Sequence, residues 1–94
     1  MNNFLSTKRE EILQLAKEYG AYNIRVFGSV SRGEETETSD VDFLIDLEDG
    51  RSLLDVGGLV MDLQELLGKK VDVVTEEGLH WYIKKSIQSE AIPL

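Results

Sequence analysis

The sequence contains no cysteine, and this absence excludes disulfide bonds, thiolate-bound zinc and cysteine nucleophiles. A single histidine, His80, is too little for a histidine triad or a histidine-rich metal site. No apolar run approaches the ~20 residues that a membrane-spanning helix needs. Residues 1–11 mix polar and charged types and lack the apolar core of a secretion signal. We therefore expect a cytoplasmic protein, which also fits the absence of cysteine.

Basic residues are scarce as well: 10 Lys and Arg stand against 18 Asp and Glu, giving a formal net charge of −8 at pH 7. An acidic surface repels a phosphate backbone, so we expect no direct binding to nucleic acid. A basic partner, or metal ions that neutralise some of the carboxylates, would each make use of this charge. The remaining composition, 41% hydrophobic and 30% charged over 94 residues, predicts one globular domain spanning 1–94.

Apolar periodicity predicts an alternation of helices and strands. Helical spacing predicts helices over about 8–19, 53–67 and 79–90. Short apolar segments predict strands over 23–27 and 71–75, and a clear period of two predicts a strand over 41–47. A further helical turn is expected after Ser29, between the first two strands. The order α-β-α-β-α-β-α predicts an α/β (α+β) fold, in which a small mixed β-sheet is flanked by helices.

The helix ends carry sequence signals of their own. Thr7 and Glu10 have the spacing of a capping box for the first helix, and Ser52 is a candidate N-cap for the second. The second helix is expected to bury a stripe of apolar residues that begins at Leu53. The third is expected to bury Ile83 with Ile87, which leaves residues 91–94 as a tail.

The clearest chemical signal lies at the start of the strand 41–47. Its odd positions are apolar, so Asp42 and Asp46 project from the opposite face, together with Asp40 just before the strand. The side chains of Asp40 and Asp42 originate ~7 Å apart and can bracket a pair of divalent cations such as Mg²⁺. Two such ions can activate an attacking oxygen and stabilise a leaving one in nucleotidyl transfer. Asp46 lies ~13 Å beyond Asp42, too far to share them.

Asp72 is the natural third ligand, because it interrupts the otherwise apolar strand 71–75. A charged side chain in such a strand is costly unless a partner, such as a metal ion, compensates it. It can face the same ions if this strand lies beside the strand 41–47. An Asp-x-Asp pair at the start of a strand is also common as two solvated acids. The carboxylates alone therefore leave both interpretations open.

A possible phosphate site follows the first strand. A strand that ends in Gly28-Ser29 and turns into a helix presents free backbone N–H groups, which bind phosphate, and the Ser29 hydroxyl can add a donor. Arg32 lies one turn further on and can grip a phosphate. An ordinary tight turn at Gly28 and a solvated cation at Arg32 are the alternatives. Phosphate donors at one strand end and metal ligands at the next indicate a nucleoside triphosphate site.

These residues resemble a known family. Gly28-Ser29, ten residues and then Asp40-Val41-Asp42 look like the GSx10DxD signature of the DNA polymerase beta-like nucleotidyltransferases. The segment GSVSRGEETETSDVDFLI resembles, more narrowly, the minimal nucleotidyltransferase (MNT) branch with its pattern GSxARGxxxxxSDxDL. The likeness continues through LLDVGGLVMDLQELLGKKVDVVT and covers about residues 9–94. Ser31 replaces the usual Ala and Phe43 the usual Leu, two mild departures.

The resemblance implies the family fold, Mg²⁺ (two ions), and a nucleotide donor, usually ATP, whose nucleotidyl group is transferred as pyrophosphate leaves. On this chain, the resemblance implies that Gly28 and Ser29 bind the triphosphate and that Asp40 and Asp42 are the metal ligands. Asp72 becomes the third carboxylate, which activates the acceptor hydroxyl. Arg32 matches the Arg-Gly pair of the family pattern.

The resemblance also implies a partner. Larger members of the superfamily carry additional domains that hold the acceptor. This chain ends near the end of the catalytic core, so we expect the acceptor to be a separate molecule that supplies its own binding surface. MNT proteins are commonly the antitoxins of HEPN-domain ribonuclease toxins, and members adenylylate a tyrosine of that partner, in a hetero-oligomer. Two alternatives remain: a non-catalytic antitoxin that acts by binding, and a stand-alone enzyme that modifies small molecules.

Overall fold

A computed structural model describes residues 3–34, 36, 38–79 and 81–94. Its elements are α1 (Asn3–Glu18), β1 (Ala21–Phe27), β2 (Val41–Leu47), α2 (Leu53–Leu67), β3 (Val71–Thr75), α3 (Trp81–Glu90) and β4 (Ile92–Pro93). The predicted α/β class, a small mixed sheet flanked by helices, is confirmed. Within the described ranges, no helix is long and apolar enough to cross a membrane.

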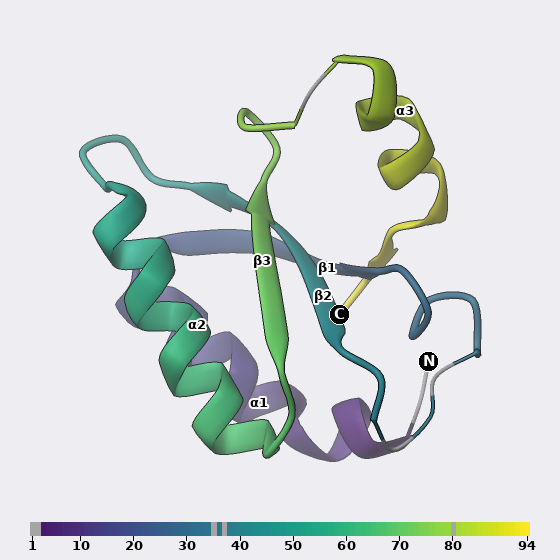
Figure 1. Cartoon of the computed structure of the whole chain (residues 1–94). Coiled ribbons are helices and arrows are strands. Elements are labelled where there is room, and N and C mark those ends of the chain that lie inside the picture. The colour runs from purple at the N-terminus through teal and green to yellow at the C-terminus, as the bar shows by residue number, and fades with distance from the viewer. Residues whose placement is uncertain (1–2, 35, 37, 80) are drawn as a thin grey trace.

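The sheet has the order β3-β2-β1-β4. β2 runs parallel to β3, and β1 is antiparallel to both β2 and β4. A parallel pair needs a crossover connection, and α2 provides it. α1 packs on β1, α2 packs on β3, and the two helices contact each other. Figure 1 shows α3 beyond the strands, away from both of these helices.

The hydrophobic core lies between the sheet and the α1–α2 pair. Phe43 and Ile45 of β2 are at most 1% exposed and belong to one cluster with Ile12 of α1 and Leu59 of α2. The odd positions of β2 therefore face the helices, as the period of two predicts. The even positions face the other side of the sheet, where Asp42 is half-buried. Core packing thus fixes which way the acidic side chains of this strand point.

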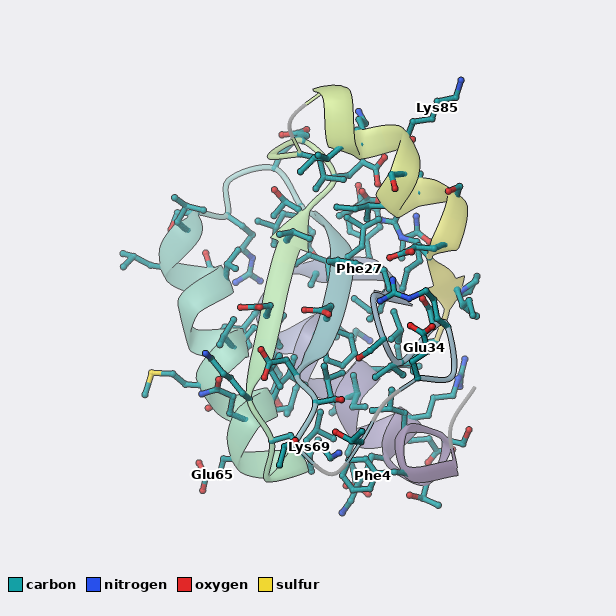
Figure 2. The ribbon with its side chains drawn as sticks, turned by 45° about the vertical axis from the view of Figure 1, so that its right-hand side comes forward. Phe4, Phe27, Glu34, Glu65, Lys69 and Lys85 are labelled. Atoms are coloured by element: carbon teal, nitrogen blue, oxygen red, sulfur yellow. The ribbon has the colours of Figure 1, made fainter. Side chains whose placement is uncertain are left out.

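The start of α1 differs from the prediction. The helix begins at Asn3, so Thr7 lies inside it, and its hydroxyl donates to the Phe4 carbonyl at 2.7 Å instead of capping a helix. Lys69, at the turn between α2 and β3, places its ammonium 5.7 Å from the centre of the Phe4 ring (Figure 2). This contact, distant in sequence, gives the first turn of α1 a tertiary partner.

The α2 helix begins as predicted. The Ser52 hydroxyl accepts a hydrogen bond from the Leu54 N–H at 3.2 Å, and the Asp55 carboxylate accepts one from the Ser52 N–H at 2.9 Å. Gly68 ends the helix with a φ of 65°. The prediction that Leu53 is buried is wrong, since it is 81% exposed. Leu53 is the first residue of α2 and follows directly on the exposed turn after β2.

The C-terminal part departs most from the prediction. α3 begins at Trp81, and His80 lies outside the described residues. Ile83, expected to be buried, is 40% exposed, because α3 does not join the α1–α2 layer. The expected tail contains β4, whose Ile92 pairs with Val26 of β1. Two residues are too few to show strand periodicity, and Pro93 is tolerated because β4 is an edge strand.

Candidate active site

Asp42 stands at the centre of the candidate site. It is in register with Asp72 on β3 and with Phe27 on β1, and Gly28 follows Phe27 directly. Neighbours in register on a sheet point to the same face, so Asp72 projects on the side of Asp42. Asp40 precedes Asp42 by two residues. The Asp72 prediction required its strand to lie beside that of Asp42, and β3 does lie beside β2. Asp42 and Asp72 are thus on adjacent strands, and Asp40 directly precedes β2.

The electrostatics reflect this proximity. Burial, and then the neighbouring carboxylates of Asp72 and Asp40, raise the pKa of Asp42, while the Arg32 guanidinium acts in the opposite direction. Like charges that share a site disfavour ionisation, so the site carries more negative charge than its own cations balance. A bound cation would relieve this excess.

The donor set fits Mg²⁺. Over the described ranges, no three acidic or histidine side chains are placed to hold a metal ion by themselves. Mg²⁺ does not need three, because it is usually bound through one or two carboxylates and completes its shell with water and substrate phosphates. The groups around Asp42 offer carboxylate oxygens, which suit Mg²⁺ better than they suit softer metals. Asp42, with Asp40 and Asp72 beside it, could hold such an ion.

Gly28 is required at this position for two separate reasons. Its φ of 74° is in the left-handed region that side chains rarely adopt. A Cβ added to it would lie 2.3 Å from Oδ2 of Asp42, well inside van der Waals contact. The absence of a side chain at Gly28 thus lets the Asp42 carboxylate approach the backbone at the end of β1.

The segment after β1 folds into a run of turns. The Gly28 carbonyl accepts from the Arg32 N–H at 3.2 Å and from the Ser31 hydroxyl at 2.8 Å, and the Ser29 carbonyl accepts from the Glu34 N–H at 2.9 Å. The first of these bonds is the helical turn that the sequence suggested, but it does not extend into a helix. Figure 2 labels Phe27 and Glu34, which flank this segment.

Glu90 is also part of the site, although no local sequence pattern predicted it. Its Oε1 accepts a hydrogen bond from the Gly28 N–H at 3.0 Å, and its Oε2 lies 3.0 Å from Nη1 of Arg32. Arg32 also pairs with Glu34, with Nε 2.7 Å from Oε1. The two predicted phosphate donors, the Gly28 N–H and Arg32, are therefore together and both bound to Glu90. Only the tertiary fold brings the last residue of α3 to this corner.

A second charged cluster lies further along the same face. Arg25, whose side chain is 14% exposed, places Nη1 2.7 Å from Glu76 and Nη2 3.4 Å from Asp46. The hydrogen bond from Arg25 is the main cause that lowers the pKa of Glu76. Asp46 is thus engaged by Arg25 and stands apart from the Asp42 group, as the sequence spacing predicts.

We expect the substitution Gly28→Ala to damage both stability and activity. The left-handed backbone alone costs a non-glycine residue about 1–2 kcal/mol. The new Cβ also has to push the Asp42 carboxylate aside, and a displacement of about 1 Å can lower a rate about 10²-fold. Thermal unfolding and the initial rate of nucleotidyl transfer measure the two effects.

Gly50 provides the matched control for this substitution. Its φ is 86° and nothing lies within 4 Å of a Cβ built on it. Gly50→Ala should therefore show the backbone cost with normal activity. Equal activity of the two variants would show that the contact between Gly28 and Asp42 does not position the carboxylate.

Comparison with known proteins identifies the family to which the chain belongs. The family model for the nucleotidyltransferase domain matches residues 5–94. The solved structure of a candidate minimal nucleotidyltransferase is 48% identical, with a TM-score of 0.86, and the match covers 96% of this chain and 92% of that one. A toxin–antitoxin crystal structure with AMP-PNP has a TM-score of 0.78 at 21% identity, over 89% of this chain and 69% of that one, and shows the fold alone.

Two curated relatives are similar over most of their length. Protein adenylyltransferase MntA of Thermococcus cleftensis is 42% identical over 79 residues, which are 84% of this chain and 80% of the relative. A candidate protein adenylyltransferase of Methanocaldococcus jannaschii is 39% identical over 84 residues, 89% of this chain and 90% of the relative. The chain therefore belongs to the nucleotidyltransferase domain family and is a nucleotidyltransferase enzyme of the minimal type.

Proposed function

We propose that this chain is a magnesium-dependent protein adenylyltransferase, which transfers AMP from ATP to a hydroxyl group of a partner toxin and thereby acts as its antitoxin. The observation that carries the proposal is the meeting of Asp42 with Asp72 in register and with Gly28 at the end of β1. Relatives 39% and 42% identical bear the name protein adenylyltransferase. The name MntA also belongs to toxin–antitoxin structures of this fold.

The residues divide into two groups by their chemistry. Gly28 and Ser29 offer backbone N–H groups to the triphosphate, and Arg32 adds a guanidinium. Asp40 and Asp42 are the carboxylates that would hold Mg²⁺, with Asp72 as a third. Bound Mg²⁺ neutralises charge on the phosphates and on the oxygens that attack and leave.

The transfer itself exchanges one phosphorus–oxygen bond for another. The acceptor oxygen forms a bond to the α-phosphorus, and the bond from that phosphorus to the bridging oxygen breaks, so that pyrophosphate leaves with the bond electrons. The acceptor proton passes to the carboxylate of Asp72. Asp72 is exposed on β3, an edge strand, whereas Asp42 is half-buried. A protein surface can therefore bring a hydroxyl to Asp72 more easily than to Asp42.

The finer proposal names the partner as a HEPN-domain ribonuclease and the acceptor as one of its tyrosines. The net charge of −8 suits a basic partner that handles RNA, because opposite charges speed the encounter of two proteins and favour the correct pairing. A tyrosine near the surface of such a partner can reach the exposed Asp72 without a separate acceptor domain.

The test combines the purified chain, Mg²⁺, ATP labelled at the α-phosphate and the HEPN protein encoded beside its gene. We expect label on a tyrosine of the toxin, located by mass spectrometry, with one pyrophosphate released for each AMP transferred. Neutralisation of the toxin without label would mean that the chain acts by binding. Label on a small molecule and never on the toxin would instead assign a stand-alone enzyme.

A further inference from the structure

The carboxylate of Glu90 lies where the nucleotide's phosphates are proposed to bind. We call Gly28, Ser29 and Arg32 the phosphate corner. Glu90 Oε1 accepts from the Gly28 N–H at 3.0 Å, and Glu90 Oε2 lies 3.0 Å from Nη1 of Arg32. A backbone N–H and a guanidinium are the donors that an anionic phosphate oxygen would use. An internal anion thus engages two of the three groups of the phosphate corner.

The neighbouring carboxylates repel Glu90 in this position. Its negative charge lies close enough to Asp42 to contribute to the raised pKa of that residue, in addition to Asp72 and Asp40. The hydrogen bonds to Gly28 and Arg32 therefore hold Glu90 against repulsion from its other neighbours. A phosphate that enters with Mg²⁺ meets the same two donors without this repulsion, because the cation offsets its charge.

The attachment of α3 allows Glu90 to leave. No described α3 side chain belongs to the buried core, and Ile83 is 40% exposed. Polar contacts help to hold the helix, such as the hydrogen bond from Gln88 to Glu76, and Lys85 points away from the sheet (Figure 2). Segments with few buried apolar contacts open at low cost. Because β4 anchors the chain after Ala91, Glu90 can turn out while β4 stays paired.

We propose that Glu90 is an internal competitor for the phosphate corner, which the triphosphate of the nucleotide must displace before the site is ready for transfer. This inference rests on the proposed function, since it requires that the phosphate corner binds a nucleotide. Glu90 thereby sets the affinity for the nucleotide and couples the position of α3 to occupancy of the site.

The test measures binding of AMP-PNP with Mg²⁺ by calorimetry, so that no turnover is needed. We expect Glu90→Ala to bind AMP-PNP about tenfold more tightly than the unsubstituted chain, because one charge-assisted contact no longer has to be broken. Glu90→Gln keeps an acceptor for the Gly28 N–H but loses the charge, so its affinity should lie between the two. This milder variant also gives an answer if Glu90→Ala fails to fold.

Glu34 offers the matched control. It also pairs with Arg32, with Nε 2.7 Å from Oε1, and Glu34→Ala removes the same unit of charge, yet the contact between Gly28 and Glu90 stays in place. We expect Glu34→Ala to change the affinity by less than about twofold. Hydrogen exchange gives a second readout: in the nucleotide-free protein the Gly28 amide should exchange faster in Glu90→Ala than in the unsubstituted chain.

The outcomes separate the inference from the proposed function. Equal affinities of the unsubstituted chain and Glu90→Ala would overturn the role of Glu90 and leave the proposed function standing. Weaker binding by a folded Glu90→Ala would also overturn it, and would make Glu90 a residue that supports the nucleotide. If neither folded protein bound AMP-PNP, the proposed function and the inference would both fail.

Discussion

Replacing Asp42 by Asn is expected to lower the rate of nucleotidyl transfer at least about 10³-fold. Asp42 is the half-buried carboxylate on which the neighbouring acids and Gly28 converge, and an amide oxygen binds Mg²⁺ far more weakly than a carboxylate does. Without the cation, the charge that develops on the transferred and leaving oxygens loses its main counterpart in the site. Transfer of α-labelled phosphate under saturating ATP and Mg²⁺ measures the effect.

The same substitution should make the metal-free protein more stable. Since burial and nearby carboxylates raise the pKa of Asp42, the folded state holds this proton more tightly than the unfolded state. Stability is therefore lost as the pH rises from the usual carboxyl range through the raised pKa, and the loss persists at pH 7. Asn has no such proton, so Asp42→Asn removes the cost. Each 1 kcal/mol gained raises Tm by about 4–8 °C in a domain of this size.

Asp46→Asn is the matched control, from the same strand and the same face. Asp46 pairs with Arg25, outside the Asp42 group, and we expect its variant to keep normal transfer activity. Thermal unfolding in EDTA at pH 7 and again in strong acid should show the Asp42→Asn advantage at pH 7 only. A lower Tm for Asp42→Asn at pH 7, or transfer activity within tenfold of the unsubstituted chain, would contradict the role given to Asp42.

The second large effect is expected from Asp72→Asn, which removes the proposed proton acceptor. General bases contribute about 10²–10⁴-fold to rates, so kcat should fall by this amount. Binding of AMP-PNP should weaken much less than in Asp42→Asn, because Asp72 is exposed and is proposed to face the acceptor rather than the nucleotide. Single-turnover transfer and calorimetry separate the two quantities.

A different result would reassign Asp72. A loss of AMP-PNP binding equal to that of Asp42→Asn would make it chiefly a metal ligand. An unchanged kcat would exclude it from the reaction. Asp49→Asn, in the exposed turn after β2, is the control for a simple change of surface charge.

The strands of the site could be predicted from the sequence because each carries its own periodicity. β2 and β3 have the predicted bounds, since the alternation of β2 and the short apolar run of β3 are local properties of the sequence. The N-cap at Ser52 is local in the same way. That the strand of Asp72 lies beside the strand of Asp42 was only a condition of the prediction, because strand order depends on how α2 crosses the sheet.

The remaining differences arise from contacts between distant residues. α1 begins early, at a first turn where Lys69 lies over the Phe4 ring, and the two residues are far apart in the sequence. Glu90 reaches Gly28 only after α3 and β4 have docked, so no local pattern marks it. The spacing that indicated a buried Leu53 was correct for a helix but carried no information on which turns of the helix are covered by the rest of the fold.

The crossover between β2 and β3 also affects how the enzyme is made. Asp42 and Asp72 become neighbours only when all of α2 and the first residues of β3 have been synthesised and packed. A nascent chain that has left the ribosome only as far as α2 can contain a folded helix, but its carboxylates are not yet assembled. The protein should therefore become able to transfer nucleotides only late in its synthesis, once β3 has packed beside β2. Fragments released before β3 should be inert toward ATP.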